Sequence, residues 1–165
     1  MISFILAAEN DTDILWNLAH KIWFDHYYPD ILTKEQIEYM LNMMYSKNVI
    51  VDEIKKGFSW YLIKDDDKPI GFLSFSYFKE NNCVKLHKLY VLLLYHGKGI
   101  GRQALDFVKN YAHKLNAVYV YLHVNKQNLK AIKAYQKAGF YIHHLEYNDI
   151  GNNFFMDDYV MKFDL

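Results

Sequence analysis

The stretch from residue 89 to residue 101 constrains the fold more than any other part of the chain. It reads Leu-Tyr-Val-Leu-Leu-Leu-Tyr-His-Gly-Lys-Gly-Ile-Gly, an apolar run that stops at Tyr95 and is followed by three glycines at alternate positions. From Arg102 onwards the apolar residues recur at helical spacing. A strand that turns into a helix through glycines gathers backbone N–H groups at the positive end of the helix dipole. The stretch therefore predicts an anion site, and in particular a phosphorylated ligand.

Other glycine motifs agree less well with this stretch. The dinucleotide pattern G-x-G-x-x-G, counted from Gly97, ends at Arg102 instead of a glycine. No acidic residue stands about 20 positions farther on, where a ribose contact would be expected. The nucleotide pattern G-x-x-x-x-G-K-[ST] is absent. A tight turn without a ligand is the remaining alternative, although three glycines before a helix are more than a turn requires.

The composition predicts one globular domain over residues 1–165, because 52% of the residues are hydrophobic and only two are proline. Nineteen basic side chains balance nineteen acidic ones, so charge gives no reason to expect a nucleic acid or a membrane as partner. The N-terminal residues do not resemble a signal peptide, and no apolar run approaches the roughly 20 residues that cross a bilayer. The single cysteine, Cys83, excludes an internal disulfide and is typical of a reducing, cytoplasmic compartment.

Apolar periodicity predicts an α/β fold, with a central mixed sheet and helices on both faces. We expect helices capped by Thr33 and Asn128, and a C-terminal cap at Gly139. The expected strands are 2–7, 58–63, 70–78, 84–93, 118–124, 140–147 and 154–163. Residues 148–153 read as a loop between the last two strands. Asp157 and Asp158 read as outward-facing residues of the final strand or its bulge, with a cation site as the alternative.

Two motifs in this context resemble the GNAT superfamily of N-acetyltransferases. His96-Gly97-Lys98-Gly99-Ile100-Gly101 is similar to the family's Q/R-x-x-G-x-G/A motif, and the preceding Leu-His-Lys-Leu-Tyr-Val to its central strand. Downstream, Asn128-x-x-Ala131-x-x-x-Tyr135-x-x-x-Gly139-Phe140 resembles the second motif of the same fold. The resemblance covers nearly the whole chain and implies the acyl-CoA N-acyltransferase fold. Two departures are His96 in place of Gln or Arg, and Leu93 where many members have proline.

The resemblance implies acetyl-coenzyme A as co-substrate and no metal. The loop would bind the pyrophosphate, while the central strand would offer its backbone to the pantetheine arm. The cofactor-binding residues implied in this way are Leu89, Tyr90, Val91, His96, Gly97, Lys98, Gly99, Ile100, Gly101, Arg102, Asn128, Ala131 and Tyr135. Asn128 either contacts the pantetheine or only caps its helix. His96 is expected to be tolerated at the loop, where it could donate a further hydrogen bond.

Three residues are implied to be catalytic: Val91, Tyr135 and His87. The Val91 N–H would stabilise the oxyanion, and Tyr135 would protonate the departing sulfur, unless it is only a core tyrosine. Many family members carry a glutamate on the central strand, whereas this chain has Lys85 and His87 there. His87 is therefore the best candidate for the general base, with a structural histidine as the alternative and His123 as a weaker candidate. The eight histidines show no metal-ligand spacing.

The expected reaction is acetyl transfer to a primary amine of a small molecule by direct attack, since Cys83 is a poor nucleophile candidate. Aromatic and acidic side chains suit a polyamine-like acceptor, although most of the aromatics could equally pack the core. The proposed acceptor-binding residues are Trp23, Tyr27, Tyr28, Asp30 and Asp149. Parts of this region also look like bacterial GNATs related to polyamine acetyltransferases. Open alternatives are a protein N-terminus, an amino acid or an aminoglycoside as acceptor, or a non-catalytic acyl-CoA sensor. Dimers are common in the family, so a homodimer is allowed.

Overall fold

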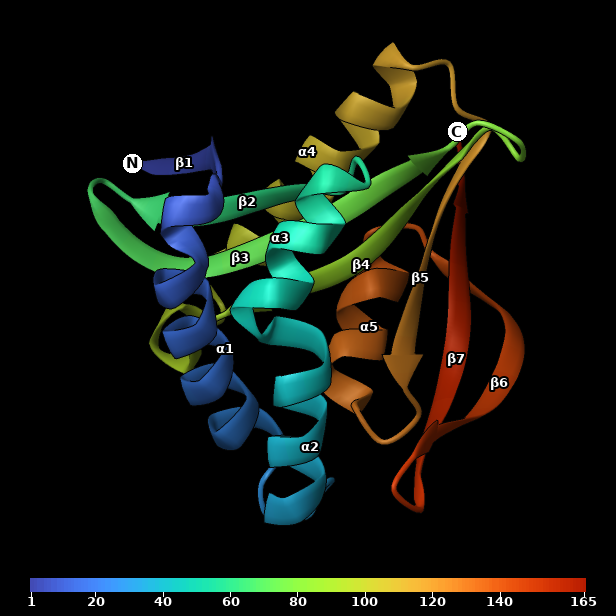
Figure 1. Cartoon of the computed structure of the whole chain (residues 1–165). Coiled ribbons are helices and arrows are strands. Elements are labelled where there is room, and N and C mark those ends of the chain that lie inside the picture. The colour runs from blue at the N-terminus through green and yellow to red at the C-terminus, as the bar shows by residue number, and fades with distance from the viewer. The chain divides into compact units, whose positions relative to one another are not determined.

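The computed structural model describes all 165 residues (Figure 1). The strands are β1 (Ile2–Leu6), β2 (Ser59–Asp65), β3 (Lys68–Phe78), β4 (Cys83–Val91), β5 (Tyr119–Asn125), β6 (Tyr141–Gly151) and β7 (Phe154–Asp164). The helices are α1 (Thr12–Tyr27), α2 (Lys34–Tyr45), α3 (Lys47–Lys55), α4 (Ile100–Lys114) and α5 (Leu129–Lys137), with short 3₁₀ turns at Glu9–Asp11 and Leu93–Tyr95. No helix is both long enough and apolar enough to span a membrane.

The seven strands form one mixed sheet in the order β1-β2-β3-β4-β5-β7-β6. Strands β4 and β5 pair in parallel, whereas β1–β2, β2–β3, β5–β7 and β6–β7 pair antiparallel. The predicted fold class, α/β with a mixed sheet, is confirmed.

The chain divides into two compact units. The first combines Met1–Ser76 with Lys88–Ala104, and the second combines Tyr77–His87 with Leu105–Leu165. Both β4 and α4 therefore contribute residues to each unit.

In the first unit, α1, α2 and α3 lie against one face of the strands (Figure 1). Buried aromatic rings of the helices and strands form a cluster. The ring centroid of Tyr45 lies 5.8 Å from that of Trp23 and 5.5 Å from that of Phe72. Two indole donors of this core are paired, because Trp23 Nε1 donates to Tyr45 Oη at 3.1 Å and Trp60 Nε1 to Glu53 at 2.9 Å. Buried hydrogen bonds of this kind avoid the cost of unpaired donors.

In the second unit, alternation along β5 separates an apolar face from a polar one. Val120, Leu122 and Val124 are buried on the face where Phe163, opposite Val120, meets Phe140 at 5.5 Å between ring centroids. Tyr119, Tyr121 and His123 point to the other face. The second unit thus has one buried apolar face and one face that carries titratable side chains.

The end of β4 differs from the prediction. The strand was expected to continue to Leu93, but it ends at Val91, and Leu93–Tyr95 form a 3₁₀ turn. The Leu92 N–H donates to Ile70 O at 2.8 Å, and Tyr95 then donates back to Leu92 O at 2.9 Å. Leu93 and Leu94 are exposed, so the apolar run does not mark the extent of the strand.

The connection between β6 and β7 also differs. Residues 148–153 were predicted to form a loop, but β6 continues to Gly151 and the turn consists of Asn152 and Asn153. Both asparagines have positive φ values, 53° and 59°, which asparagine tolerates better than most residues. The prediction was wrong because polar residues on an exposed strand resemble a loop.

Gly71 provides a test of how closely β3 and β4 approach. A Cβ at this position would overlap the Tyr90 carbonyl oxygen and lie 3.0 Å from Val91 Cα. We expect Gly71→Ala to lower the free energy of unfolding by about 2 kcal/mol, measured by urea denaturation. Gly101→Ala is the control, because a Cβ there meets nothing within 4 Å. Equal stability of the two variants would contradict this interpretation.

Candidate active site

The glycine loop forms a backbone nest at the start of α4. Gly97 and Gly99 adopt left-handed conformations with φ values of 75° and 77°, and a Cβ on either would meet nothing within 4 Å. The helix begins at Ile100, two residues earlier than predicted, so the N–H groups of Ile100, Gly101 and Arg102 belong to its first turn. Lys98 Nζ lies 4.8 Å from the centroid of the Tyr95 ring, which places a cation beside the loop. The geometry is that of an anion site.

His96 contacts the backbone of β4. Its Nε2 donates to the Val91 carbonyl oxygen at 2.9 Å, and its ring lies 4.8 Å from the ring of His26. The hydrogen bond that we expected His96 to contribute to a ligand is, at Nε2, made to the protein instead. His96 therefore connects the glycine loop to the last residue of β4, next to the Leu89, Tyr90 and Val91 backbone groups predicted to contact the pantetheine.

The second motif lies on α5 and its cap. Asn128 accepts a hydrogen bond from the Ala131 N–H at 3.2 Å, so its capping role is confirmed and accounts for its side chain. Tyr135 is half-buried on the helix, with its ring 6.0 Å from the Phe140 ring in an edge contact. Gly139 ends the helix with a φ of 94°, which confirms the predicted C-terminal cap.

The predicted alternation along β4 is consistent with the ring contacts. Lys85 Nζ lies 5.6 Å from the centroid of the Tyr121 ring on β5, and burial lowers the pKa of Lys85. His87, two residues on, is half-buried, and its ring centroid lies 6.5 Å from that of Phe78. Both residues belong to the second unit, as does His123.

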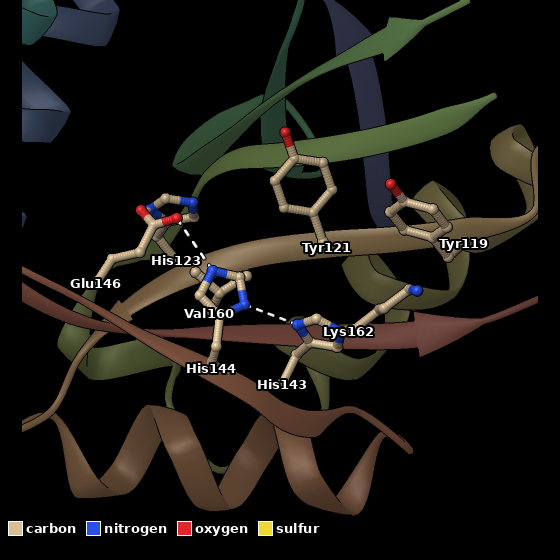
Figure 2. A pocket seen from close by; sticks show the side chains of 8 residues that line it. All are labelled: Tyr119, Tyr121, His123, His143, His144, Glu146, Val160 and Lys162. Carbon is tan, nitrogen blue, oxygen red and sulfur yellow. Dashed lines mark hydrogen bonds and ion pairs between the residues drawn. The ribbon is translucent and has the colours of Figure 1, made fainter. Parts of the chain in front are cut away.

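A pocket of about 160 Å³ opens on the polar face of the second unit (Figure 2). Its lining residues come from three strands and are Tyr119, Tyr121, His123, His143, His144, Glu146, Val160 and Lys162. Glu146 joins two of the histidines, since its carboxylate oxygens lie 3.1 Å from His144 Nε2 and 3.5 Å from His123 Nδ1. His143 Nδ1 in turn lies 2.7 Å from His144 Nδ1.

A register shift in β6 brings the adjacent histidines to the same pocket. Ile142 pairs with Met161 but His144 pairs with Val160, so His143 is the extra residue of a bulge. We did not predict the roles of His143, His144 and Glu146 from the sequence. Only the adjacent pair His143-His144 signalled a cluster, and strict alternation would have placed the two on opposite faces.

Burial, hydrogen bonds and neighbouring charges shift several pKa values around the pocket. Burial raises the pKa of the Asp158 carboxyl to about 6, with a further increase from Asp157 and Glu146. Burial also lowers the pKa of His123, and Lys85 lowers it further, whereas Glu146 raises it. Hydrogen bonding to His144 is the main cause of a lowered pKa at Glu146. Asp158 is 2% exposed, so the prediction that it faces outward was wrong.

The residues predicted to bind the acceptor have different environments. Trp23 and Tyr27 are buried in the first unit, where Tyr27 Oη lies 3.1 Å from Tyr90 Oη, so both pack the core. Tyr28 and Asp30 are exposed just after α1. Asp149 is exposed on β6, where it pairs with Phe155 in the sheet and does not lie in a loop. No group of three or more His, Cys, Asp or Glu side chains is arranged to hold a metal ion.

Residues 14–140 match the model of the acetyltransferase (GNAT) family. Because this match extends over more than half of the chain, the protein belongs to the GNAT family of acetyltransferases.

Two curated relatives match only part of the chain, at low sequence identity. An uncharacterized N-acetyltransferase of Archaeoglobus fulgidus is 28% identical over 97 residues, covering 50% of this chain and 66% of that protein. A second, from Methanocaldococcus jannaschii, has the same identity over 97 residues but is covered over only 43% of its length. The match thus spans less than two thirds of either relative.

Two solved structures are similar in fold. PaiA N-acetyltransferase from Thermoplasma acidophilum, in complex with coenzyme A, has a TM-score of 0.84 at 24% identity and covers 100% of this chain and 99% of its own. Spermidine N-acetyltransferase SpeG from Vibrio cholerae has a TM-score of 0.72 at 17% identity, over 99% of this chain and 95% of its own. At these identities the likeness concerns the fold.

The raised pKa of Asp158 has a measurable consequence. Between about pH 4 and pH 6 the folded state binds more protons at Asp158 than the unfolded state, so stability falls as the pH rises through this window. We expect Asp158→Asn to weaken this decline and to be more stable than wild type at pH 7 by about 2 to 3 kcal/mol. Urea denaturation followed by circular dichroism measures this difference. Asp67→Asn, at an exposed turn residue, is the control; parallel pH dependences for wild type and Asp158→Asn would contradict the assignment.

Proposed function

We propose that this protein transfers the acetyl group of acetyl-coenzyme A to a primary amine of a small molecule. The observation that carries the proposal is the nest made by Gly97 and Gly99 at the start of α4, in a chain that belongs to the GNAT family. The nest supplies backbone donors for the pyrophosphate, and Lys98 supplies a cation beside it. A fold neighbour that contains coenzyme A supports the same cofactor here. The proposal treats residues 1–165 as a single catalytic domain.

The proposed chemistry is direct attack by the amine on the thioester. A neutral amine forms the new C–N bond, the C–S bond breaks, and Tyr135 gives its phenolic proton to the departing thiolate. The Val91 N–H stabilises the negative charge that develops on the carbonyl oxygen, while His96 holds the carbonyl of the same residue. The amine must lose a proton before it attacks, and His87 and His123 are the two candidate acceptors.

The proposed acceptor is an aliphatic amine of the polyamine type. The exposed Tyr28 offers an aromatic face, and the exposed Asp30 and Asp149 offer carboxylates, to which ammonium groups bind by cation–π attraction and charge pairing. A fold neighbour is a spermidine N-acetyltransferase, which supports this choice. A cytoplasmic location and a homodimer are further parts of the proposal. The free thiol of Cys83 supports the first, and the frequency of dimers in the family supports the second.

Thiol release from acetyl-coenzyme A tests the function. We expect spermidine and spermine to raise turnover above hydrolysis, and more than amino acids, peptide N-termini or aminoglycosides do. Tyr135→Phe, assayed with the best amine, should lower kcat by about 100-fold and change the Kd for coenzyme A far less, since the ring that contacts the cofactor is kept. Tight cofactor binding with no amine-dependent turnover would instead identify a non-catalytic acyl-coenzyme A sensor.

The nest is tested by its backbone conformation. We expect Gly99→Ala to raise the Kd for coenzyme A about tenfold, since alanine disfavours the left-handed conformation that presents the N–H groups. Gly57→Ala is the matched control, because Gly57 has a φ of 94° and open space around it in the turn after α3. Isothermal titration calorimetry measures both variants. If they bind coenzyme A equally well, the nest is not the cofactor site.

A further inference from the structure

We infer that His123, oriented by Glu146, accepts the proton of the acceptor amine, and that Glu146, His144 and His143 conduct this proton to solvent. The inference rests on the proposed acetyl transfer and names the general base of that reaction. It selects His123 in preference to His87.

The position of His123 in the sheet is the first reason. The parallel register of β4 and β5 runs from Cys83–Tyr119 to Leu86–Leu122, so His87 and His123 are the next residues on each strand. Alternation places both on the face where Lys85 lies over the Tyr121 ring. The two histidines are therefore neighbours at the point where the paired register of the central strands ends.

The partner of His123 is the second reason. Its Nδ1 lies 3.5 Å from a Glu146 oxygen. In the inferred relay, Nδ1 of the neutral ring carries the proton that faces the carboxylate, and Nε2 presents its lone pair to the amine. A carboxylate that orients a histidine in this way fixes the tautomer and stabilises the imidazolium once it forms. Burial and the Lys85 ammonium lower the pKa of His123, which keeps the ring neutral before it receives a proton.

The route to solvent is the third reason. The exposed fraction of the side chain rises from 24% at His123 to 34% at Glu146 and 47% at His144. Glu146 lies 3.1 Å from His144, and His144 lies 2.7 Å from His143. The four side chains from His123 to His143 thus form a continuous series beside the pocket (Figure 2). The bulge in β6 places both His143 and His144 beside the pocket, and bulges are frequent beside active sites.

The proton balance requires such a route. An ammonium acceptor loses two protons when it becomes an amide; one ends on the coenzyme A sulfur through Tyr135, and the other must leave the site. His123 accepts this second proton at Nε2 and passes its Nδ1 proton to Glu146, from which it reaches His144, His143 and solvent. No further reactant is needed.

The pH dependence of the reaction depends on the titratable groups of the strands around His123. These are Lys85 and His87 on β4, Glu146 and His144 on β6, Asp158 and Lys162 on β7, and Tyr121 on β5 itself. Lys85 and His144 lower the pKa of His123 and Glu146 raises it. Asp158 and Glu146 also act on Lys85, where both raise the pKa.

The experiment compares pH profiles of kcat/KM for acetyl transfer by the full chain. In wild type, kcat/KM should fall at low pH as the general base becomes protonated; this fall is the acid limb of the profile. We expect His123→Gln to lower kcat about 100-fold at neutral pH, to remove the acid limb and to leave coenzyme A binding unchanged. His87→Gln should keep the acid limb. His113→Gln, on the exposed face of α4, is the matched control and should behave as wild type.

Two further variants shift the acid limb in opposite directions if His123 is the base. Glu146→Gln removes the group that raises the pKa of His123, so the limb moves to lower pH. Lys85→Met removes a group that lowers this pKa, so the limb moves to higher pH. A merely structural His123 predicts no such pair of opposite shifts.

The outcomes separate the two proposals. Wild-type protein that acetylates no amine refutes the proposed function. Active wild type, together with a His123→Gln variant that keeps its acid limb, or with a limb lost only in His87→Gln, overturns the inference and leaves the function intact.

Discussion

The end of β4 is the constraint on which the cofactor half of the proposed site depends. Three contacts fix it: the Leu92 N–H on Ile70 O, the His96 ring on Val91 O, and the close approach of the Tyr90 carbonyl to Gly71. Because the chain leaves the sheet at this fixed point, the nest that follows is held in place before any ligand arrives. Donors that are already oriented require little reorganisation when an anion binds.

The second unit combines irregular backbone with unusual electrostatics. The bulge in the edge strand β6 carries residues that line the pocket, and the buried Asp158 on β7 interacts electrostatically with one of them, Glu146. Lys85, His144 and Asp157 also act on the pKa of His123 or of Asp158. A protein that needed only stability would gain from replacing Asp158, since its burial opposes ionisation. Groups with perturbed pKa values gathered beside a pocket are instead typical of functional sites.

Sequence reasoning succeeded where one residue satisfies one local requirement. Left-handed glycines in the nest, the Asn128 cap and the Gly139 terminus are of this kind, since each depends on a few neighbouring residues. It failed where strand pairing decides. The end of β4, the two-asparagine turn and the burial of Asp158 follow from register, and an apolar or polar run does not encode its partner. The Glu146 cluster was missed for the same reason, because one bulged residue reverses the faces of a strand.

The aromatic core of the first unit also determines what spectroscopy can detect. All three tryptophans, Trp16, Trp23 and Trp60, belong to Met1–Ser76, and two of them are buried beside Tyr45. Intrinsic tryptophan emission therefore reports the first unit alone. If the second unit, which holds the histidine pocket, loosened, the emission would stay unchanged and the protein would be taken as intact. The unit with the titratable cluster becomes visible only through its tyrosines or through its backbone.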